Sequence, residues 1–273
     1  MDFLNNLFNL KGKTAVLTGG GGILASEMAM GFLKVGVKVV LLDINENNLN
    51  SKVDQLTQFG EIFGIKCNVL DEKNLTEVNN SVLTKFGKID ILINAAGGNM
   101  PGATIGIDQT IFDLKIDELQ KVTNLNFYGT VLPTLIFGKT MSDQKSGSII
   151  NISSMATFRS ITRVVGYSAA KASVDNFTRW MAVELAQKFG NGIRVNAIAP
   201  GFLLTDQNRN LLTEKDGSLT QRGKDIIHMT PFKRFGEPEE LVGSVLWLAS
   251  DASKFVTGTV IPIDGGFSIF SGV

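Results

Sequence analysis

The stretch that decides the fold reads KTAVLTGGGGILASEMAMGFLKV and spans residues 13–35. Lys13 to Thr18 form an apolar run typical of a buried strand, four glycines follow, and Ile23 to Val35 has the pattern of a helix. A strand that passes through a glycine loop into a helix N-terminus aims backbone N–H groups at a pyrophosphate. The stretch therefore predicts a dinucleotide site in an α/β fold.

Strand-like runs alternate with stretches long enough for helices along the whole chain. We expect strands near residues 14–18, 38–43, 62–67, 89–94, 147–152, 193–198 and 259–263. This alternation predicts one domain over residues 1–273, a Rossmann-type doubly wound parallel sheet of about seven strands with helices on both faces. Ligands of such sheets bind at the carboxyl ends of the strands, so we expect the functional residues to share one crevice there.

The composition favours a protein that binds a small molecule. The 273 residues include 26 basic and 26 acidic side chains, without a basic block of the kind that binds nucleic acid. No apolar run approaches the roughly 18 residues of a membrane-spanning helix, and the N-terminus lacks the features of a signal peptide. Cys67 and His228 are the single cysteine and histidine, which excludes an intrachain disulfide and argues against a metal site. We therefore expect a soluble, cytoplasmic protein without a metal.

Tyr167 and Lys171 lie four residues apart in the sequence YSAAK, and Ser154 lies thirteen residues before Tyr167. On a helix, a spacing of four places the phenol and the ammonium on one face. A positive charge nearby favours the phenolate and lowers the tyrosine pKa from its reference of about 10. Such a tyrosine can exchange a proton with an alcohol or a carbonyl. The alternative is a solvated surface pair, which also occurs at this spacing.

Several motifs in a fixed order resemble those of the short-chain dehydrogenase/reductase family, from Lys11 to Gly266. The motifs are Thr18-Gly19, the Asn-Ala-Ala-Gly turn at residues 94–97, Asn126, the set Ser154, Tyr167 and Lys171, and Pro200-Gly201 followed by Thr205. The resemblance implies hydride transfer between a nicotinamide ring and a carbinol carbon. It implies that Tyr167 is the general acid or base and that Ser154 binds the substrate oxygen. Lys171 would lower the tyrosine pKa and bind the nicotinamide ribose, and Asn126 would hold a water that links Lys171 to solvent.

The resemblance also implies a cofactor site. Its residues would be Thr18, Gly19, Gly21, Gly22, Ile23, Leu24, Asp43, Asn68, Val69, Asn94, Ala95, Ala96, Gly97, Tyr167, Lys171, Pro200, Gly201 and Thr205. Asp43 ends the second predicted strand, where a carboxylate can accept hydrogen bonds from the adenosine ribose and would repel a 2′-phosphate. No arginine lies in the glycine loop. We therefore expect NAD rather than NADP.

Two places depart from the family pattern. Ile23 and Ala25 stand where the pattern Thr-Gly-x-x-x-Gly-x-Gly has its second and third glycines. Ile23 resists positive φ and adds bulk near a phosphate, whereas the run Gly19 to Gly22 can supply a turn shifted by one residue. Asn68-Val69 replaces the usual Asp-Val beside the adenine and keeps one acceptor and one donor. We expect both changes to affect the strength of cofactor binding.

A closer resemblance concerns the substrate. Stretches such as GGNMP at residues 97–101 and RFG at 234–236 are similar to those of the family's D-mannonate oxidoreductases, which interconvert D-mannonate and D-fructuronate. A sugar acid needs a cation for its carboxylate and polar groups for its hydroxyls. The expected substrate-binding residues are Ser154, Asn99, Arg159, Arg163, Gln207 and Arg209. The alternatives are a gluconate 5-dehydrogenase or another polyol or sugar reductase of this family, and a dinucleotide-binding protein without catalysis.

Two segments outside these motifs carry further expectations. A polar insertion around residues 205–230 follows the Pro-Gly segment and would close over the site as a lid, and the alternative is an ordinary helical hairpin. Many relatives assemble as tetramers, and the apolar ending FSIF at residues 267–270 suits a buried subunit contact. We therefore expect a homotetramer.

Overall fold

The computed structural model describes residues 2–205 and 208–272 of the chain. In this part of the chain, seven strands form one parallel sheet in the order β3-β2-β1-β4-β5-β6-β7. The strands are β1 (Thr14–Thr18), β2 (Lys38–Asp43), β3 (Ile62–Lys66), β4 (Ile91–Asn94), β5 (Gly147–Ile152), β6 (Ile193–Pro200) and β7 (Val260–Ile263). The predicted doubly wound fold is confirmed. The strand order reverses between β1 and β4, which is where such sheets bind their ligands.

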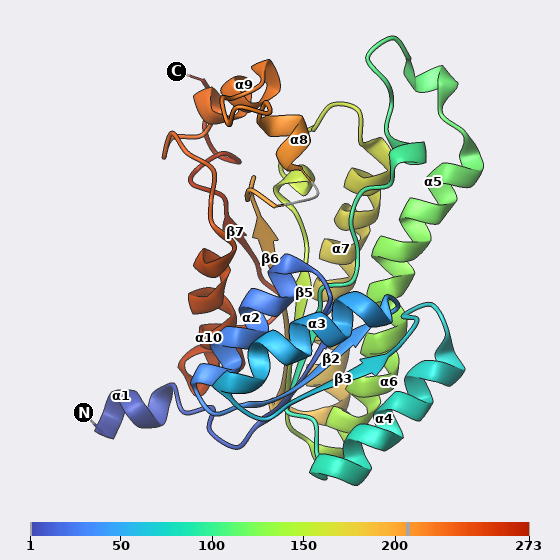
Figure 1. Ribbon diagram of the computed structural model, residues 1–273. Coiled ribbons are helices and arrows are strands. Elements are labelled where there is room, and N and C mark those ends of the chain that lie inside the picture. The colour runs from blue at the N-terminus through green and yellow to red at the C-terminus, as the bar shows by residue number, and fades with distance from the viewer. Residues whose placement is uncertain (1, 206–207, 273) are drawn as a thin grey trace.

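Helices cover both faces of this sheet, as Figure 1 shows. The helices are α1 (Asp2–Leu7), α2 (Ile23–Lys34), α3 (Glu46–Leu56), α4 (Glu72–Phe86), α5 (Ile116–Thr123), α6 (Gly129–Gln144), α7 (Val165–Phe189), α8 (Arg209–Leu212), α9 (Gln221–Met229) and α10 (Val242–Ala249). One face carries α2, α3 and α10, and the other carries α4, α6 and α7. Each face has its own hydrophobic core.

The apolar sequence of the strands follows from these two covered faces. In β1, Ala15 and Leu17 belong to the core beneath α2 and α10, while Val16 between them belongs to the core beneath α6 and α7. All three side chains are fully buried. Successive side chains of a strand point to opposite faces, so a strand with helices on both sides needs apolar residues at every position.

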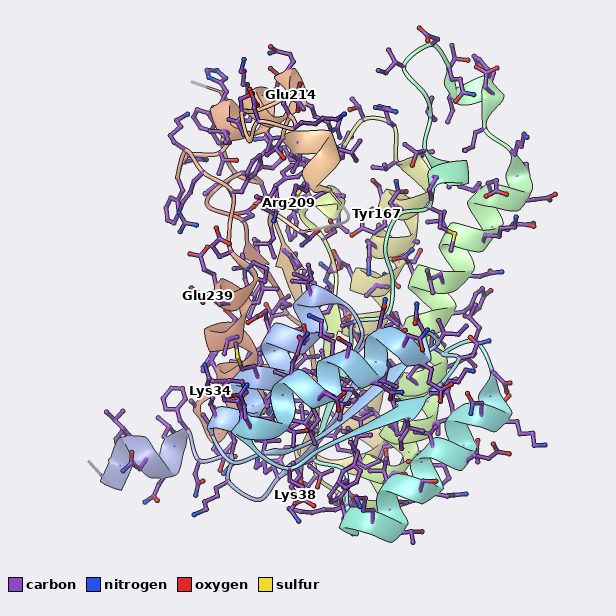
Figure 2. The ribbon with its side chains drawn as sticks, viewed as in Figure 1. Lys34, Lys38, Tyr167, Arg209, Glu214 and Glu239 are labelled. Carbon is purple, nitrogen blue, oxygen red and sulfur yellow. The ribbon has the colours of Figure 1, made fainter. Side chains whose placement is uncertain are left out.

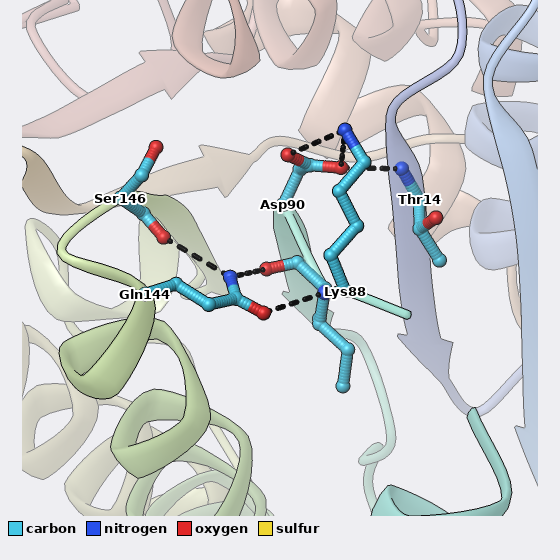
Figure 3. A network of polar contacts seen from close by, with 6 residues as sticks. Thr14, Lys88, Asp90, Gln144 and Ser146 are labelled. Carbon is cyan, nitrogen blue, oxygen red and sulfur yellow. Dashed lines mark hydrogen bonds and ion pairs between the residues drawn. The ribbon is translucent and has the colours of Figure 1, made fainter. Parts of the chain in front are cut away.

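A polar network closes the amino end of the sheet (Figure 3). Asp90, just before β4, accepts a hydrogen bond from the backbone N–H of Thr14 at 2.8 Å and pairs with Lys88 at 3.1 Å. The side chain of Gln144, at the end of α6, bonds the backbone N–H and C=O of Ile89 at 3.0 and 2.8 Å. Because a side chain satisfies the backbone of Ile89, β4 begins at Ile91 rather than at residue 89 as expected.

A chain of buried amides and hydroxyls crosses the middle of the molecule. Asn94 on β4 donates from Nδ2 to Oδ1 of Asn151 on β5 and to Oγ1 of Thr134 on α6, both at 2.8 Å. Asn151 in turn donates to Oγ1 of Thr178 on α7 at 2.8 Å. All four side chains are buried, and buried amides need partners of this kind. The amide network therefore holds α6 and α7 against the carboxyl ends of β4 and β5.

A wide helical turn interrupts the long rod formed by α5 and α6 (Figure 1). Residues Asn124–Tyr128 form a π-helical turn between the two helices. The inserted residue of a π turn changes the direction in which side chains point, and such turns are frequent at functional sites. Asn126 lies at the centre of this turn and is fully buried.

The segment after β6 lies at the carboxyl end of the sheet and contains α8 and α9 (Figure 1). An isolated bridge joins Thr213 to Leu219 between the two helices, so the described part of the segment has the form of a hairpin. Thr205 and Asn208, at its start, line the main cavity. Closure of this segment as a lid stays a prediction.

The apolar ending is partly used within the chain itself. Phe267 is 9% exposed and packs edge-on against Phe202, with ring centroids 5.2 Å apart. Ile269, by contrast, is 83% exposed. Phe267 therefore packs within its own chain, and the subunit contact expected for residues 267–270 stays a prediction. The homotetramer stays a prediction.

Replacing Asn151 with Ala should lower the free energy of unfolding by about 2 kcal/mol, because it removes a partner from two buried polar groups. Urea unfolding at a fixed protein concentration measures the change. Asn80 is exposed on α4 and serves as the matched control, since Asn80→Ala removes the same amide without a buried partner. Equal midpoints for the two variants would contradict the role given to the amide network.

Candidate active site

A cavity of about 510 Å³ opens at the carboxyl ends of the strands. Ligand pockets of small-molecule enzymes have volumes of this size. Of the residues expected at the cofactor or the reacting centre, the cavity is lined by Gly19, Gly21, Gly22, Ile23, Leu24, Asp43, Ala95, Gly97, Ser154, Tyr167, Pro200, Gly201 and Thr205. The parallel sheet therefore brings residues as much as 186 positions apart in sequence, from Gly19 to Thr205, to one cavity.

The glycine loop leaves no room for side chains. Gly19 has φ +69°, and a Cβ there would lie 2.9 Å from the carbonyl oxygen of Ala95. A Cβ on Gly20 would lie 2.6 Å from Cβ of Leu41. Backbone without side chains at the start of a helix is what a pyrophosphate requires, so these residues fit a dinucleotide.

Ile23 is accommodated because the turn lies before it. The left-handed residue is Gly19, and Gly22 is the N-cap of α2 with an extended backbone. Ile23 is the first residue of the helix and has no positive φ. The positive φ falls on Gly19, so Ile23 needs none, and it contributes a half-buried side chain to the cavity lining.

Asp43 is tied to the glycine loop at the edge of this cavity. Its Oδ2 accepts a hydrogen bond from the N–H of Gly21 at 2.9 Å, and its Oδ1 accepts one from the N–H of Asn45 at 2.8 Å. Each carboxylate oxygen can accept a second hydrogen bond. The carboxylate is therefore fixed in place beside the loop, with capacity for a ribose hydroxyl.

Other residues expected at the cofactor lie outside the cavity lining and form hydrogen bonds that hold its loops. Thr18 Oγ1 accepts hydrogen bonds from the N–H groups of Ala95 and Ala96, both at 3.0 Å, and joins the loops after β1 and β4. The side chain of Asn94 belongs to the buried amide network. Asn68 Oδ1 accepts from the N–H of Leu70 at 3.0 Å and shapes the turn before α4. Direct contacts of Asn68, Val69 and Asn94 with a cofactor stay predictions.

The four residues expected to be catalytic come from the loop after β5, from α7 and from the π turn. Lys171 is 4% exposed and donates from Nζ to the carbonyl oxygen of Ile152 at 2.7 Å. Its Nζ lies 5.7 Å from the centre of the Tyr167 ring. Asn126 donates from Nδ2 to the carbonyl of Gly98 and accepts from the N–H of Gly98, at 2.8 and 2.9 Å.

Gly97 is the point at which Asn126 and Lys171 approach the same backbone. A Cβ on Gly97 would lie 2.6 Å from Oδ1 of Asn126 and 3.3 Å from Nζ of Lys171. Glycine here lets the amide and the ammonium share one small space behind Tyr167. The expected link from Lys171 through Asn126 is consistent with this arrangement, and the water that would complete it stays a prediction.

Burial dominates the electrostatics of this site. Burial raises the pKa of Tyr167 above its usual 10.0, and a hydrogen bond with Ser154 lowers it in part. The direction is opposite to the lowering expected from Lys171. Burial also lowers the pKa of Lys171 from 10.5 to about 8, and the negative charge of Asp175 raises it in part. With a pKa of about 8, Lys171 keeps most of its positive charge at neutral pH, yet burial decides the direction of the pKa shift at Tyr167.

Asp175 and Ser153 are site residues that the sequence motifs did not single out. Asp175 is 5% exposed and accepts a hydrogen bond from Oγ of Ser153, which is 1% exposed and precedes Ser154. Asp175 follows Lys171 by four residues on α7, as Lys171 follows Tyr167. This repeated spacing was the available signal, because it places all three side chains on one helix face.

The residues expected to bind the substrate differ in their hydrogen-bond partners and in whether they belong to the described cavity lining. Arg159 donates from Nε to the carbonyl of Ser268 at 3.0 Å and from Nη2 to the carbonyl of Phe270, so the structure shows it holding the C-terminal segment. Asn99 Nδ2 donates to Oγ1 of Thr104 at 2.5 Å. Figure 2 shows Arg209 on α8 and Tyr167 on α7, both at the carboxyl end of the sheet. Gln207 lies outside the described residues. Binding of substrate by these residues stays a prediction.

Two features are absent from residues 2–205 and 208–272. No helix in these ranges combines the length and the apolar character needed to cross a membrane. No cluster of three or more His, Cys, Asp or Glu side chains in the same ranges has the arrangement of a metal site.

Comparison with known proteins gives matches over almost the entire chain. A family model described as enoyl-(acyl carrier protein) reductase matches residues 22–268. An uncharacterized oxidoreductase of Bacillus subtilis (strain 168), UxuB, is 45% identical over 97% of this chain and 98% of its own. A 2-dehydro-3-deoxy-D-gluconate 5-dehydrogenase of Dickeya dadantii (strain 3937) is 33% identical over 96% of this chain and 98% of its own.

A solved structure is similar over the same length. It is that of a Haemophilus influenza protein provisionally named a D-mannonate oxidoreductase, with bound NAD, and it has a TM-score of 0.90 at 43% identity. The match covers 97% of this chain and 98% of that one. Fold, motifs and sequence similarity thus agree, and the chain belongs to the short-chain dehydrogenase/reductase family of NAD(P)-dependent oxidoreductases.

Proposed function

We propose that the protein uses NAD to interconvert a hydroxyl and a ketone of a sugar acid, with D-mannonate and D-fructuronate as its substrates. The observation that carries the proposal is that one cavity has Asp43, Ser154 and Tyr167 in its lining. The cavity matches a cofactor with an adenosine ribose at one end and a reacting ring at the other. Similarity to the NAD-bound Haemophilus protein supports both the cofactor and the substrate class.

The proposed reaction assigns one proton-transfer role and one positioning role to the cavity wall. A nicotinamide cofactor, when bound, would supply the hydride in reduction and accept it in oxidation. Tyr167 donates its phenolic proton to the substrate oxygen during reduction and removes it during oxidation. Ser154, which is hydrogen-bonded to Tyr167, donates to the same oxygen and stabilises the charge that develops there.

Lys171 controls the charge balance around Tyr167 in this proposal. Its ammonium is buried, and its neighbours are the carbonyl of Ile152 from β5, Asp175 from its own helix and the amide of Asn126 from the π turn. Asp175 is the negative charge that favours the protonated lysine. A protonated Lys171 favours the phenolate form of Tyr167 when that proton leaves, so Asp175 contributes to the reaction through Lys171.

A second candidate substrate has support from one relative. The Dickeya dehydrogenase acts, by its name, on 2-dehydro-3-deoxy-D-gluconate and is 33% identical to this chain. This agrees with the alternative of a gluconate 5-dehydrogenase or related sugar-acid enzyme. Both candidates are acyclic sugar acids oxidised at a secondary hydroxyl, so they require the same catalytic residues and differ in the contacts to the hydroxyls.

The substrate is tested by following NADH absorbance at 340 nm with D-fructuronate, D-tagaturonate, 5-ketogluconate and 2-dehydro-3-deoxy-D-gluconate, the last in the oxidative direction. We expect the highest kcat/KM with D-fructuronate. Tyr167→Phe should reduce turnover by roughly 10²- to 10⁴-fold, the usual contribution of a positioned acid or base, while NADH still binds. Turnover of none of these acids by a protein that binds NADH would reject the sugar-acid assignment, and unchanged turnover in the variant would reject the role of Tyr167.

Asp43→Asn should reduce the preference for NADH over NADPH. The amide removes the negative charge that repels a 2′-phosphate. It also weakens the charged hydrogen bond to the ribose of NADH, and this loss lowers the affinity for NADH by roughly 10-fold or more. The ratio of kcat/KM for the two cofactors measures the effect. Asp54→Asn, an exposed charge on α3, is the control and should leave the ratio unchanged. A wild-type enzyme that prefers NADPH would contradict the role of Asp43.

Lys171 should titrate near pH 8 in the cofactor-free protein, because burial disfavours its charge. Asp175→Asn removes the charge that partly offsets burial, so the pKa of Lys171 should fall below 8. NMR titration of lysine labelled with ¹³C at Cε measures both values, and Lys171→Arg assigns the signal. Asp143→Asn, on the surface of α6, is the control. A Lys171 pKa near 10 would show that burial does not control this group.

A further inference from the structure

We infer that Arg163 and Arg222 together form the site that binds the carboxylate of the substrate. The inference rests on the proposed function, because it supplies the acid-recognition element of a keto sugar acid reductase. Arg163 was one of three arginines expected from the sequence to have this role, whereas Arg222 was not among them. The two arginines come from segments about sixty residues apart that the fold brings together.

Arg163 is held rigidly in an unusual conformation just before α7. Its φ is +75°, in the left-handed region that non-glycine residues rarely adopt. Two hydrogen bonds fix it to Ile105: its Nε donates to the carbonyl of Ile105 at 2.6 Å, and its own carbonyl accepts from the N–H of Ile105 at 2.9 Å. Strained residues that the surroundings hold in place are concentrated at functional sites. The Nη groups of Arg163 have no partner within hydrogen-bonding distance in the described part of the chain.

Arg222 approaches the same place from α9. Its Nη1 donates to Oγ1 of Thr162, the residue before Arg163, at 3.4 Å. This long contact leaves the other guanidinium N–H groups for a stronger acceptor. The nearest acid on its own helix, Asp225, has an oxygen that accepts from Nε2 of Gln221 at 2.7 Å. Among the residues that the structure describes, Arg163 and Arg222 have no carboxylate within 4 Å.

The two guanidiniums repel one another. Both side chains are half-buried. Burial lowers the pKa of Arg222, the positive charge of Arg163 lowers it further, and Asp225 offsets part of this. Another guanidinium of the chain does have a carboxylate partner: Arg234 forms two charged hydrogen bonds with Glu240, at 2.7 and 2.6 Å. Two like charges that interact with one another, and that have no counter-ion among the described residues, are stabilised by an anion that binds both.

The position of the pair suits the carboxylate end of an open-chain sugar acid. Arg163 precedes Tyr167 by four residues, and Arg222 belongs to the segment whose first residues, Thr205 and Asn208, line the cavity. The pair itself stands outside the cavity lining. The acid group is thus held at the outer end of the substrate, which leaves the carbonyl carbon beside Tyr167. The hydroxyl of Thr162, which accepts a hydrogen bond from Arg222, adds one donor beside that guanidinium.

The test compares D-fructuronate with its uncharged primary amide in the intact enzyme. Arg222→Gln should lower kcat/KM for the acid roughly 10- to 100-fold, mainly through KM, and change the value for the amide by less than about twofold. Arg163→Lys, which keeps the charge, should retain more activity on the acid than Arg163→Gln. Lys224→Gln removes one positive charge from the exposed side of α9 and should leave both substrates unchanged.

The outcomes separate this site from the proposed function. If the wild type reduces D-fructuronate and Arg222→Gln behaves like Lys224→Gln, the carboxylate site is wrong and the proposed function stands. Equal losses for the acid and the amide also reject the site, because they show a structural effect. Other keto acids could prove to be the substrates. If Arg222→Gln then lowers kcat/KM for those acids and not for their amides, the carboxylate site stands and the proposed sugar acid is wrong. A wild type that prefers uncharged ketones overturns both.

Discussion

The buried ammonium of Lys171 is the constraint on which the active site depends. A charge with so little exposure requires a fixed acceptor, and the carbonyl of Ile152 at the end of β5 supplies it at 2.7 Å. This bond fixes the register of α7 against the sheet, so Tyr167, one turn earlier on the same helix, is positioned with it. The space for Nζ in turn requires glycine at position 97. Catalytic geometry and packing are therefore set by the same contact.

The architecture could be predicted from sequence because its signals are local. Apolar runs, a glycine loop and alternation of element types specify a parallel sheet, and that topology alone gathers Gly19, Asp43, Ser154 and Pro200 at one edge. Even Ile23, a departure from the family pattern, follows local rules, since glycine at position 19 takes the positive φ and Ile23 begins the helix. The order of strands, loops and helices along the sequence was therefore enough to predict which residues meet at the cofactor end of the site.

Side-chain partners could not be predicted in the same way, because they depend on contacts between distant segments. Arg159 has the charge of a substrate ligand, but the sequence carries no sign of its hydrogen bonds to two carbonyls of the C-terminal segment. The hydrophobicity of Phe267 likewise gave no sign that its partner within the chain is Phe202. The pKa of Tyr167 depends on how deeply the fold buries it, which spacing along a helix does not reveal. Side-chain partners and burial of this kind become known only from the folded structure.

The amino end of the sheet carries structural hydrogen bonds, whereas the carboxyl end carries the cavity. At the amino end, Asp90 and Gln144 satisfy backbone groups that no strand pairs with, and α1 projects away from that end in Figure 1. At the carboxyl end lie the cavity, α9 and the last described residues, held there by Arg159. For practical use, attachment to a solid support through the N-terminal helix leaves the cavity facing solution. Attachment through the C-terminal segment would place the support against the entrance of the site.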